Sequence, residues 1–245
     1  MVEGCTPYPA DFVQKYVREG YWQARTLGDL LDGSARRFGS RTAVSDGSKK
    51  VSYEELQQFS NRLAFHFLDR GLKPGDIVLL QLPNVWEFVP IFFALSKIGV
   101  FPVMCLPPHR HTELTYFAKL TRATGYFVVP QFRGFDYLAM AREVQREVPS
   151  LKYVVAVGDG TQEGISYLEP WLHEPTETRF GTDELARYRP DPFDVAFFLL
   201  SGGTTGIPKL IPRTHAELPV PQRAIHTGDG LGLRHGLPGG DPGRA

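Results

Sequence analysis

Hydrophobic residues in the first part of the chain recur every three or four positions, the spacing that places them on one side of an amphipathic helix. Thr26 precedes the second of these stretches and can cap its first turn. Ser52 begins a Ser-Tyr-Glu-Glu sequence with the form of a capping box, ahead of the third stretch. The pattern predicts helices over residues 9–19, 27–38 and 53–70, with a β-hairpin over residues 42–52.

From residue 77 the pattern changes to short, wholly apolar runs that alternate with helical stretches. Strands without polar alternation are typical of a parallel sheet that is buried on both faces. Asn84 and Thr112 are expected to begin the first two helices, and residues 174–192 to form a connecting loop. The predicted fold class is therefore α/β, with parallel sheets flanked by helices. Strands are predicted at 77–82, 101–105, 126–129, 154–157, 194–200 and 210–211, and helices at 84–97, 112–123, 136–147 and 166–172.

The composition of the 245 residues is that of an ordinary globular protein, with 42% hydrophobic and 22% charged residues. Lys and Arg together number 27, as do Asp and Glu, so the formal net charge is zero. A neutral chain has no bulk electrostatic attraction for nucleic acid or for an anionic membrane. We therefore expect neither of these partners.

The cysteines, the N-terminus and the most apolar segment indicate where the protein is located and whether it binds a metal. Cys5 and Cys105 have no metal-ligand spacing, so two reduced thiols and no metal site are expected. The N-terminus lacks the basic and apolar regions of a signal peptide. The most apolar segment, 85–106, is interrupted by Glu87 and Lys97, which favours a helix and a strand over a membrane span. These features predict a soluble, cytoplasmic protein.

A nine-residue string after the predicted strand at 194–200 carries the most chemical information in the chain. Its glycines let the backbone approach an anion, its hydroxyl groups can donate hydrogen bonds, and its lysine adds a positive charge. This composition suits a polyphosphate. The string is Ser201-Gly202-Gly203-Thr204-Thr205-Gly206-Ile207-Pro208-Lys209.

Two other interpretations of the string are weaker. The common phosphate loop requires a Gly-Lys-Ser/Thr ending, whereas Pro208 precedes Lys209 here and Leu210 follows it. A loop made of Gly, Ser and Thr alone is more often a plain turn. Lys209 and the order of the nine residues together distinguish the string from such a turn.

The complete string resembles the signature phosphate loop of the adenylate-forming (AMP-binding) ligases, Ser/Thr-Gly-Gly/Ser-Thr/Ser-Thr-Gly-x-Pro-Lys, at every position. Other parts of residues 1–217 are similar to the stand-alone aryl-acid adenylating enzymes of siderophore pathways. The sequence is most similar to the enzymes of this group that act on 2,3-dihydroxybenzoate, and next to those that act on salicylate. The similar stretches are 4–9, 20–22, 26–31, 81–84, 107–117 and 209–215.

This resemblance implies a two-step ligase of siderophore and nonribosomal peptide biosynthesis. In the first step the carboxylate of an aryl acid attacks the α-phosphate of ATP, bound with Mg²⁺, and expels pyrophosphate. In the second step the acyl group passes to the phosphopantetheine thiol of an aryl carrier protein. By similarity, Lys209 would offset negative charge as pyrophosphate leaves. The β- and γ-phosphates would be surrounded by Ser201, Gly202, Gly203, Thr204, Thr205 and Gly206.

Several other residues have both a functional and a structural interpretation. His109 and Arg110 could clamp an anion, but loop packing or capping of the next helix is expected instead. His215 could reach the ATP site or serve a structural role. No Ser-His-Asp order, metal cluster or carboxylate pair stands out. The three tryptophans are expected in the core: Trp22, Trp86 and Trp171.

The chain departs from the family pattern after residue 217. The family's aryl-acid pocket, hinge and catalytic lysine are not found in the remaining residues, which are rich in Gly, Pro, Arg and His. Thr227-Gly228-Asp229 copies a ribose-binding tripeptide but follows the loop too soon, so we interpret it as coincidence. We interpret 1–217 as the N-terminal portion of the adenylation domain. Residues 218–245 are expected to be a disordered tail, read in a shifted frame that begins near Glu217, and the gene sequence tests this.

Three classes of function stay open. The first is an aryl-acid ligase, represented here by an N-terminal fragment that is expected to be inactive alone. The second is a non-catalytic remnant that binds nucleotide phosphates weakly. The third is a fragment of an acyl-CoA ligase. The stretches that resemble aryl-acid adenylating enzymes disfavour it. Acid-dependent exchange of pyrophosphate into ATP separates the first class from the second.

Overall fold

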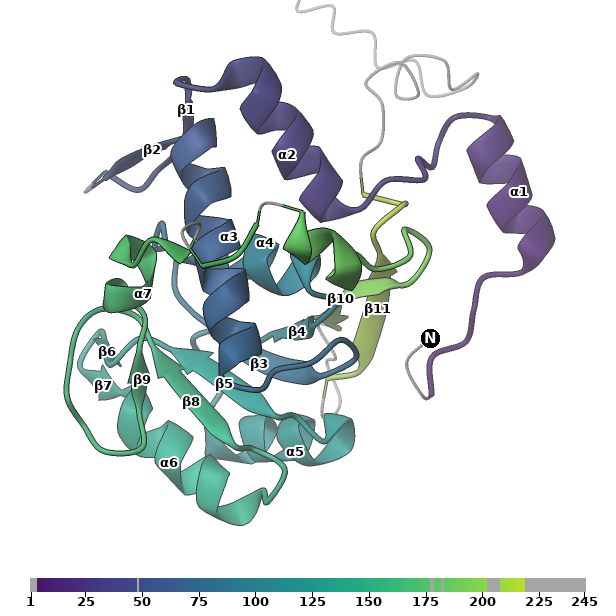
Figure 1. Cartoon of the computed structure of the whole chain (residues 1–245). Helices are drawn as coiled ribbons and strands as arrows, with labels where there is room; N and C mark the ends of the chain where they lie inside the picture. Colours follow the sequence, from purple (N-terminus) through teal and green to yellow (C-terminus); the bar gives the residue numbers. More distant parts are fainter. Residues whose placement is uncertain (1–3, 48, 177–178, 182, 202–207, 219–245) are drawn as a thin grey trace, which may run out of the picture.

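The computed structural model describes residues 4–47, 49–176, 179–181, 183–201 and 208–218 (Figure 1). Its centre is a seven-stranded sheet with the strand order β11-β10-β4-β3-β5-β8-β9. Neighbouring strands run parallel except β10 and β11, which pair antiparallel. The predicted α/β class is confirmed. The strands are β3 (Ile77–Gln81), β4 (Phe101–Met104), β5 (Gly125–Val128), β8 (Tyr153–Ala156), β9 (Ser166–Tyr167), β10 (Val195–Leu200) and β11 (Leu210–Thr214).

Helices cover both faces of the sheet, as Figure 1 shows: α2, α3 and α4 lie on one face, and α5 and α6 lie on the other. The first helix, α1, stands to one side of the sheet, beyond β11. The helices are α1 (Ala10–Arg18), α2 (Leu27–Phe38), α3 (Tyr53–Asp69), α4 (Phe88–Lys97), α5 (His111–Thr121), α6 (Tyr137–Glu147), α7 (Glu169–His173) and the 3₁₀ helix η2 (Glu184–Tyr188). The small antiparallel pairs are β1 (Thr42–Ser45) with β2 (Lys50–Ser52), and β6 (Gln131–Phe132) with β7 (Phe135–Asp136).

The cap predicted at Thr26 and the capping box predicted at Ser52 are both confirmed, and Thr26 also forms a complete capping box with Asp29. The hydroxyl of Thr26 accepts a hydrogen bond from the Asp29 amide at 3.1 Å, and the Asp29 carboxylate accepts one from the Thr26 amide at 2.8 Å. Ser52 and Glu55 make the same reciprocal pair, at 3.2 and 2.8 Å. Each box satisfies two amide groups that the start of a helix leaves unpaired. The predicted hairpin between the two helices is confirmed as β1 and β2.

Two predicted helix starts are wrong. Helix α4 begins at Phe88 rather than at Asn84, because the carboxylate of Asp46 accepts the Trp86 amide at 3.1 Å and the preceding residues form a turn. Helix α5 begins at His111, so Thr112 lies inside the helix and Arg110 occupies the cap position. The Arg110 amide donates to the Glu113 carboxylate at 3.0 Å, so this helix start is held by Glu113 rather than by the hydroxyl of Thr112.

The segment before η2 also differs from its prediction. Ser166 and Tyr167, expected in a helix, form β9 and pair with β8. The helix α7 begins only at Glu169 and has Pro170 in its first turn, a position that proline tolerates because its missing N–H has no partner there. Residues 174–192, predicted as a connecting loop, contain the short 3₁₀ helix η2. Within the described residues, no helix has both the length and the apolar character needed to cross a membrane.

A partly buried ion pair joins α2 to α4. The side chain of Lys97 is only 8% exposed, and its ammonium lies 2.5 Å from a carboxylate oxygen of Asp32. The side-chain amide of Gln57, on α3, donates a hydrogen bond to the same oxygen at 2.7 Å. Gly28 on α2 packs on the Lys97 stem, because a Cβ at that position would lie 2.9 Å from Lys97 Cγ. Three helices therefore meet around one buried cation.

Removal of Asp32 should destabilise this junction. In Asp32→Ala the Lys97 ammonium stays buried without a carboxylate, and we expect a loss of about 2 kcal/mol in the free energy of unfolding, since Asp32 itself is partly exposed. Urea denaturation measures it. Glu143→Ala, on the exposed side of α6, is the matched control and should change stability by less than about 0.5 kcal/mol. Equal effects of the two substitutions would contradict the role of the pair.

Candidate nucleotide-phosphate site

The nine-residue string connects β10 to β11. Residues Val195 to Phe198 of β10 are buried, and the strand ends directly before Ser201. Because β10 runs parallel to β4, Ser201 lies at the carboxyl edge of the sheet, where ligands bind in open α/β folds. The predicted strand after the string is confirmed and extends to Thr214 as β11. The central residues of the string lie outside the described residues: Gly202, Gly203, Thr204, Thr205, Gly206 and Ile207.

Ser201 and Lys209 close the base of this loop. The Ser201 amide donates to the Lys209 carbonyl oxygen at 2.9 Å, and the Lys209 amide donates to the Ser201 hydroxyl oxygen at 2.8 Å. The preceding rung of the hairpin pairs Leu200 with Leu210. By accepting this hydrogen bond, the Ser201 hydroxyl oxygen holds the two ends of the loop together. The hydroxyl proton can still be donated to another group. This loop-closing role was not predicted from the sequence, because it depends on the antiparallel return of β11.

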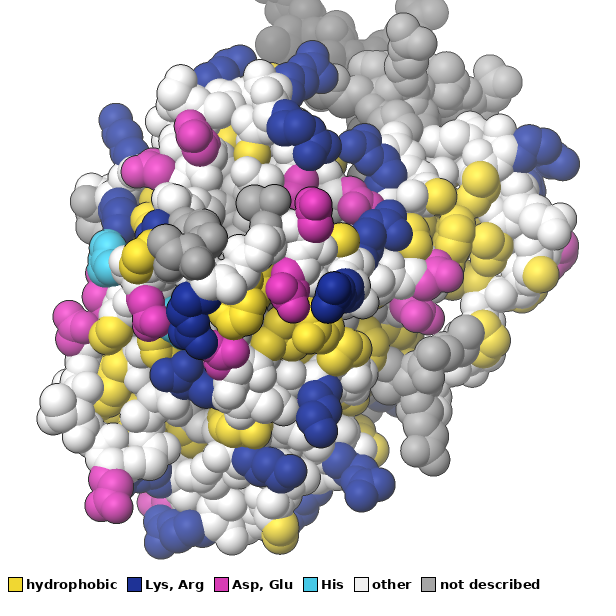
Figure 2. All heavy atoms as spheres, viewed as in Figure 1, with side chains coloured by type: hydrophobic (Ala, Val, Ile, Leu, Met, Phe, Trp, Pro, Cys, Tyr) yellow, Lys and Arg dark blue, Asp and Glu magenta, His cyan; other side chains and the backbone are white. Residues whose placement is uncertain are grey.

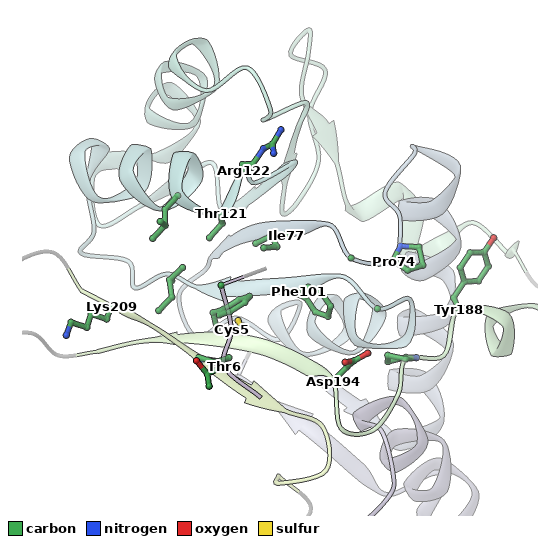
Figure 3. A pocket seen from close by; sticks show the side chains of 18 of the residues that line it. Cys5, Thr6, Pro74, Ile77, Phe101, Thr121, Arg122, Tyr188, Asp194 and Lys209 are labelled. Atoms are coloured by element: carbon green, nitrogen blue, oxygen red, sulfur yellow. The ribbon is translucent and has the colours of Figure 1, made fainter. Parts of the chain in front are cut away.

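Lys209 is the positive charge at the end of the hairpin. Lys209 is one of the residues that line the neighbouring cavity, and Figure 3 shows its side chain at one end of this lining. Among the described residues, no carboxylate lies within ion-pair distance of its ammonium. A lysine in this position is available to an anion that approaches the end of the hairpin.

A cavity of about 1360 Å³ lies beside the hairpin, on the face of β10 that carries Phe198 (Figure 3). Its cationic lining residues do not converge on one point. The guanidinium of Arg189 is held by both carboxylate oxygens of Asp29, at 2.9 and 2.7 Å, and Arg187 lies 3.8 Å from Glu184. Burial acts to raise the pKa of Asp29, but hydrogen bonds from Arg189 and Thr26 together outweigh it and lower that pKa to about 2. Arg187 and Arg189 are therefore both paired with carboxylates rather than free to bind an anion in the cavity.

His109 and Arg110 have the structural role that was expected. The Nδ1 atom of His109 accepts the Leu106 amide at 3.1 Å. The guanidinium of Arg110 donates to the carbonyl oxygens of Pro107 and His109, at 2.6 and 3.0 Å, and lies over the ring of Phe135. Both side chains thus hold the loop that leads into α5.

His215 also has a structural role. Its side chain is buried, and Nδ1 accepts the amide of Leu27, the first residue of α2, at 3.3 Å. Burial lowers the pKa of His215 to about 4, so the ring is neutral near pH 7. The alternative in which His215 reaches the ATP site is not supported, because the ring is occupied at the start of α2.

The remaining candidate residues are structural as well. Trp86 and Trp171 are buried in the core as predicted, whereas Trp22 is only half-buried, against Tyr8 and Tyr16. Cys5 and Cys105 are both free thiols, and burial raises the pKa of each. In the part of the chain that the structure describes, no three His, Cys, Asp or Glu side chains are placed to hold a metal ion.

The family of the chain is established by comparison with known proteins. The model of the AMP-binding enzyme family matches residues 31–232, most of the chain. The chain belongs to the AMP-binding enzyme family. The family predicted from the phosphate-loop string and its flanking stretches is therefore confirmed.

Similar proteins include aryl-acid ligases. The chain is 40% identical over 217 residues to the 2,3-dihydroxybenzoate-AMP ligase of Bacillus subtilis (89% of this chain, 38% of that protein). It is 42% identical over 219 residues to the salicyl-AMP ligase / salicyl-S-ArCP synthetase of Mycobacterium tuberculosis (87% and 37%). The apo structure of MbtA from Mycobacterium smegmatis superposes with a TM-score of 0.76 at 38% identity (87% and 38%). The chain thus spans about two fifths of the length of these relatives, in their N-terminal part.

The hydrogen bond from the Lys209 amide to Ser201 can be tested without nucleotide. In Ser201→Ala the Lys209 amide loses its hydrogen-bond acceptor. The closed loop is then less stable by about 1 kcal/mol, and hydrogen exchange of the Lys209 amide should be roughly fivefold faster. Exchange measured by mass spectrometry on the peptide containing Lys209 reports this. Ser201→Thr keeps the hydroxyl and should exchange at the wild-type rate. An unchanged rate in Ser201→Ala would show that the hydroxyl does not close the loop.

The buried His215 should make stability depend on pH. The folded protein binds the His215 proton only near pH 4, whereas the unfolded chain binds it near pH 6.5, so stability is complete above pH 6.5 and falls as the pH drops toward 4. This one group should lower the free energy of unfolding by about 2 kcal/mol at pH 5 relative to pH 7.5. His215→Asn keeps an acceptor for Leu27 and does not titrate. Urea denaturation at both pH values should therefore show a smaller pH-dependent loss in the variant, and parallel losses would contradict the assignment.

Proposed function

We propose that this chain supplies the ATP-phosphate-binding part of a ligase that activates an aryl acid, either 2,3-dihydroxybenzoate or salicylate. The observation that supports the proposal is the position of the described ends of the phosphate-loop string: Ser201 follows β10 at the carboxyl edge of the sheet and is hydrogen-bonded to Lys209. The names of the similar proteins support the choice of an aryl acid as substrate.

In the proposed first step, a carboxylate oxygen of the aryl acid forms a bond to the α-phosphorus of ATP. The bond from that phosphorus to the bridging oxygen breaks, and pyrophosphate leaves with the electron pair. The Lys209 ammonium would lie against the departing phosphates and stabilise the charge that develops there. Backbone amides of Gly202, Gly203 and Gly206, with the hydroxyls of Ser201, Thr204 and Thr205, would hold the β- and γ-phosphates.

Mg²⁺ would enter with the nucleotide and neutralise part of the phosphate charge. The donor set of the site fits this arrangement, because Ser201 keeps a hydroxyl proton to donate and Lys209 has no carboxylate partner among the described residues. The described residues have no cluster of ligands for a metal of their own, so the ion would be held through the phosphates.

In the proposed second step, the aryl group passes from the adenylate to a thiol. A carrier-protein phosphopantetheine is the acceptor we favour, since one relative is named a salicyl-S-ArCP synthetase. Coenzyme A is the alternative, because another relative, 39% identical over 215 residues, is named a salicylyl-CoA synthase / salicylate adenylyltransferase. Both acceptors present the same thiol chemistry, and product analysis with each in turn distinguishes them.

Joining residues 1–217 to the C-terminal part of the Bacillus subtilis relative tests the proposed reaction. The chimera should exchange pyrophosphate into ATP only when 2,3-dihydroxybenzoate or salicylate is present. Lys209→Ala should lower the exchange rate about 100-fold, the size expected when one stabilising group is lost at the reacting phosphates. Lys152→Ala, an exposed lysine elsewhere on the surface, is the matched control and should leave the rate unchanged.

A polypeptide of these 245 residues alone should show no acid-dependent exchange, since it spans about two fifths of the relatives. Robust exchange by this polypeptide would contradict that part of the proposal. A folded chimera whose exchange is insensitive to Lys209→Ala would overturn the role of the loop.

A further inference from the structure

Gln81 is a fully buried polar residue at the end of β3 that has no part in the reaction proposed above. Its side-chain nitrogen donates hydrogen bonds to the carbonyl oxygens of Leu106 and His109, at 2.8 and 3.0 Å. Its side-chain oxygen accepts a hydrogen bond from the hydroxyl of Tyr126, which is buried on β5. The donors and the acceptor of this amide all have partners, so the side chain is held in one orientation.

These hydrogen bonds hold residues 106–110, the loop that connects β4 to α5 and is called the β4–α5 loop below. The two carbonyl groups bound by Gln81 lie near the two ends of the loop. Between them, the carbonyl oxygen of Pro107 accepts the hydroxyl of Tyr137 at 2.9 Å and the guanidinium of Arg110 at 2.6 Å. The carbonyl groups of residues 106, 107 and 109 are therefore all bound to side chains, which restricts movement of the loop.

The backbone amides of the β4–α5 loop are occupied as well. The Leu106 amide donates to Nδ1 of His109 at 3.1 Å, and the His109 amide donates to the Leu106 carbonyl oxygen at 3.0 Å. The Arg110 amide is bound by Glu113. The two residues between Leu106 and His109 are prolines, which have no N–H and a fixed φ. The loop is thus a rigid segment whose backbone has no donor left for a phosphate.

The β4–α5 loop begins at the edge of the sheet where the phosphate-loop string begins. Strands β4 and β10 are parallel neighbours, with Phe198 opposite Val103. Leu106 lies three residues after Val103, and Ser201 lies three residues after Phe198, so the two segments leave adjacent strands at the same level. Adjacent strands are about 4.8 Å apart. The loop therefore flanks the described start of the string.

A fixed neighbour is useful to this string because of its composition. Three of its nine residues are glycines, which give a backbone little conformational preference of their own. Ordering such a segment around phosphates costs conformational entropy, and neighbours that limit the positions open to it reduce that cost. On one side this limit comes from β11, through the hydrogen bonds between Ser201 and Lys209. On the side of β4 it can come from the β4–α5 loop.

Long-range charge offers little to offset the ordering cost. The formal net charge of the chain is zero. Figure 2 shows positive and negative side chains interspersed over the middle of the face that Figure 1 views, rather than gathered by sign. Local order around the string is therefore the main contribution that the rest of the described fold can make to ATP binding.

We propose that Gln81 is a positioning residue for ATP, which fixes the β4–α5 loop beside the start of the phosphate-loop string and so favours the ordering of the string around the phosphates. Gln81 acts through the loop and does not touch the nucleotide. The inference rests on the proposed function. It also gives one role to two of the stretches that resemble the family, 81–84 and 107–117, because Gln81 joins them.

The test measures binding of ATP with Mg²⁺ to the chimera described above, by equilibrium dialysis without any aryl acid. Gln81→Leu and Gln81→Met keep a side chain of similar size but donate no hydrogen bond to the loop, and each should raise the Kd for ATP about tenfold. Tyr126→Phe is the matched control. It removes a hydrogen bond from the same buried amide but leaves both donors to the loop, so its Kd should stay within about twofold of the wild type. Circular dichroism confirms that each variant is folded.

Hydrogen exchange in the 245-residue chain reports the position of the loop without nucleotide. On the peptide that contains residues 106–110, Gln81→Leu should accelerate exchange roughly fivefold, because the Leu106 and His109 carbonyl groups lose their common partner. Tyr126→Phe should exchange at the wild-type rate there. A residue that only stabilised the core would change the midpoint of unfolding in both variants, with no difference between them in ATP affinity.

Two results would overturn the proposal: wild-type ATP affinity in the folded Gln81 variants, or an equal loss of affinity in Tyr126→Phe. A wild-type chimera that does not bind ATP would overturn both this proposal and the proposed function. Because binding is measured without aryl acid, a chimera that binds ATP but shows no acid-dependent exchange counts against the proposed function alone.

Discussion

Burial of the apolar strands β3, β4 and β10 is the constraint on which the rest of the structure depends. Each strand lacks polar alternation and is stable only with cover on both faces, which α4 and its neighbours supply on one side. Parallel pairing then brings the carboxyl ends of the strands to one edge. The phosphate-loop string follows β10 at this edge, so its location is a consequence of how the core is buried.

A second set of contacts joins the N-terminal segment to the residues after β11. His215 accepts the first amide of α2, and Glu217 accepts the hydroxyl of Tyr8, across separations of 188 and 209 residues in sequence. The neutral imidazole and the buried carboxylate are both satisfied there, which makes them compatible with an apolar environment. The hairpin that closes the loop is therefore anchored by the opposite end of the chain.

The described part of the site is chemically simple. Ser201 fixes the backbone of Lys209, and the lysine side chain extends past the end of the hairpin. Such an arrangement can position and stabilise a phosphate but has no nucleophile or general base. In the reaction proposed above, these described residues would contact only the phosphates of ATP. This agrees with a chain that spans about two fifths of its relatives.

The local signals in the sequence were sufficient for much of the fold. Wholly apolar runs predicted the strands, and the cap at Thr26 and the capping box at Ser52 predicted two helix starts, because these signals act within a few residues. The nine-residue string predicted the family, since its order of glycines, hydroxyls and lysine is rarely accidental. The six residues 202–207 lie outside the described part, so their phosphate contacts stay a prediction.

Only the tertiary structure decided where local signals competed. Asn84 is a good capping residue, but Asp46, distant in sequence, takes the Trp86 amide and delays the helix. Ser166 and Tyr167 carry no strong strand signal, and their pairing with β8 makes them a strand. The roles of His215 and of the Ser201 hydroxyl likewise depend on partners that folding brings together. A sequence pattern records the preference of a segment, whereas a long-range hydrogen bond exists only once both segments are in place.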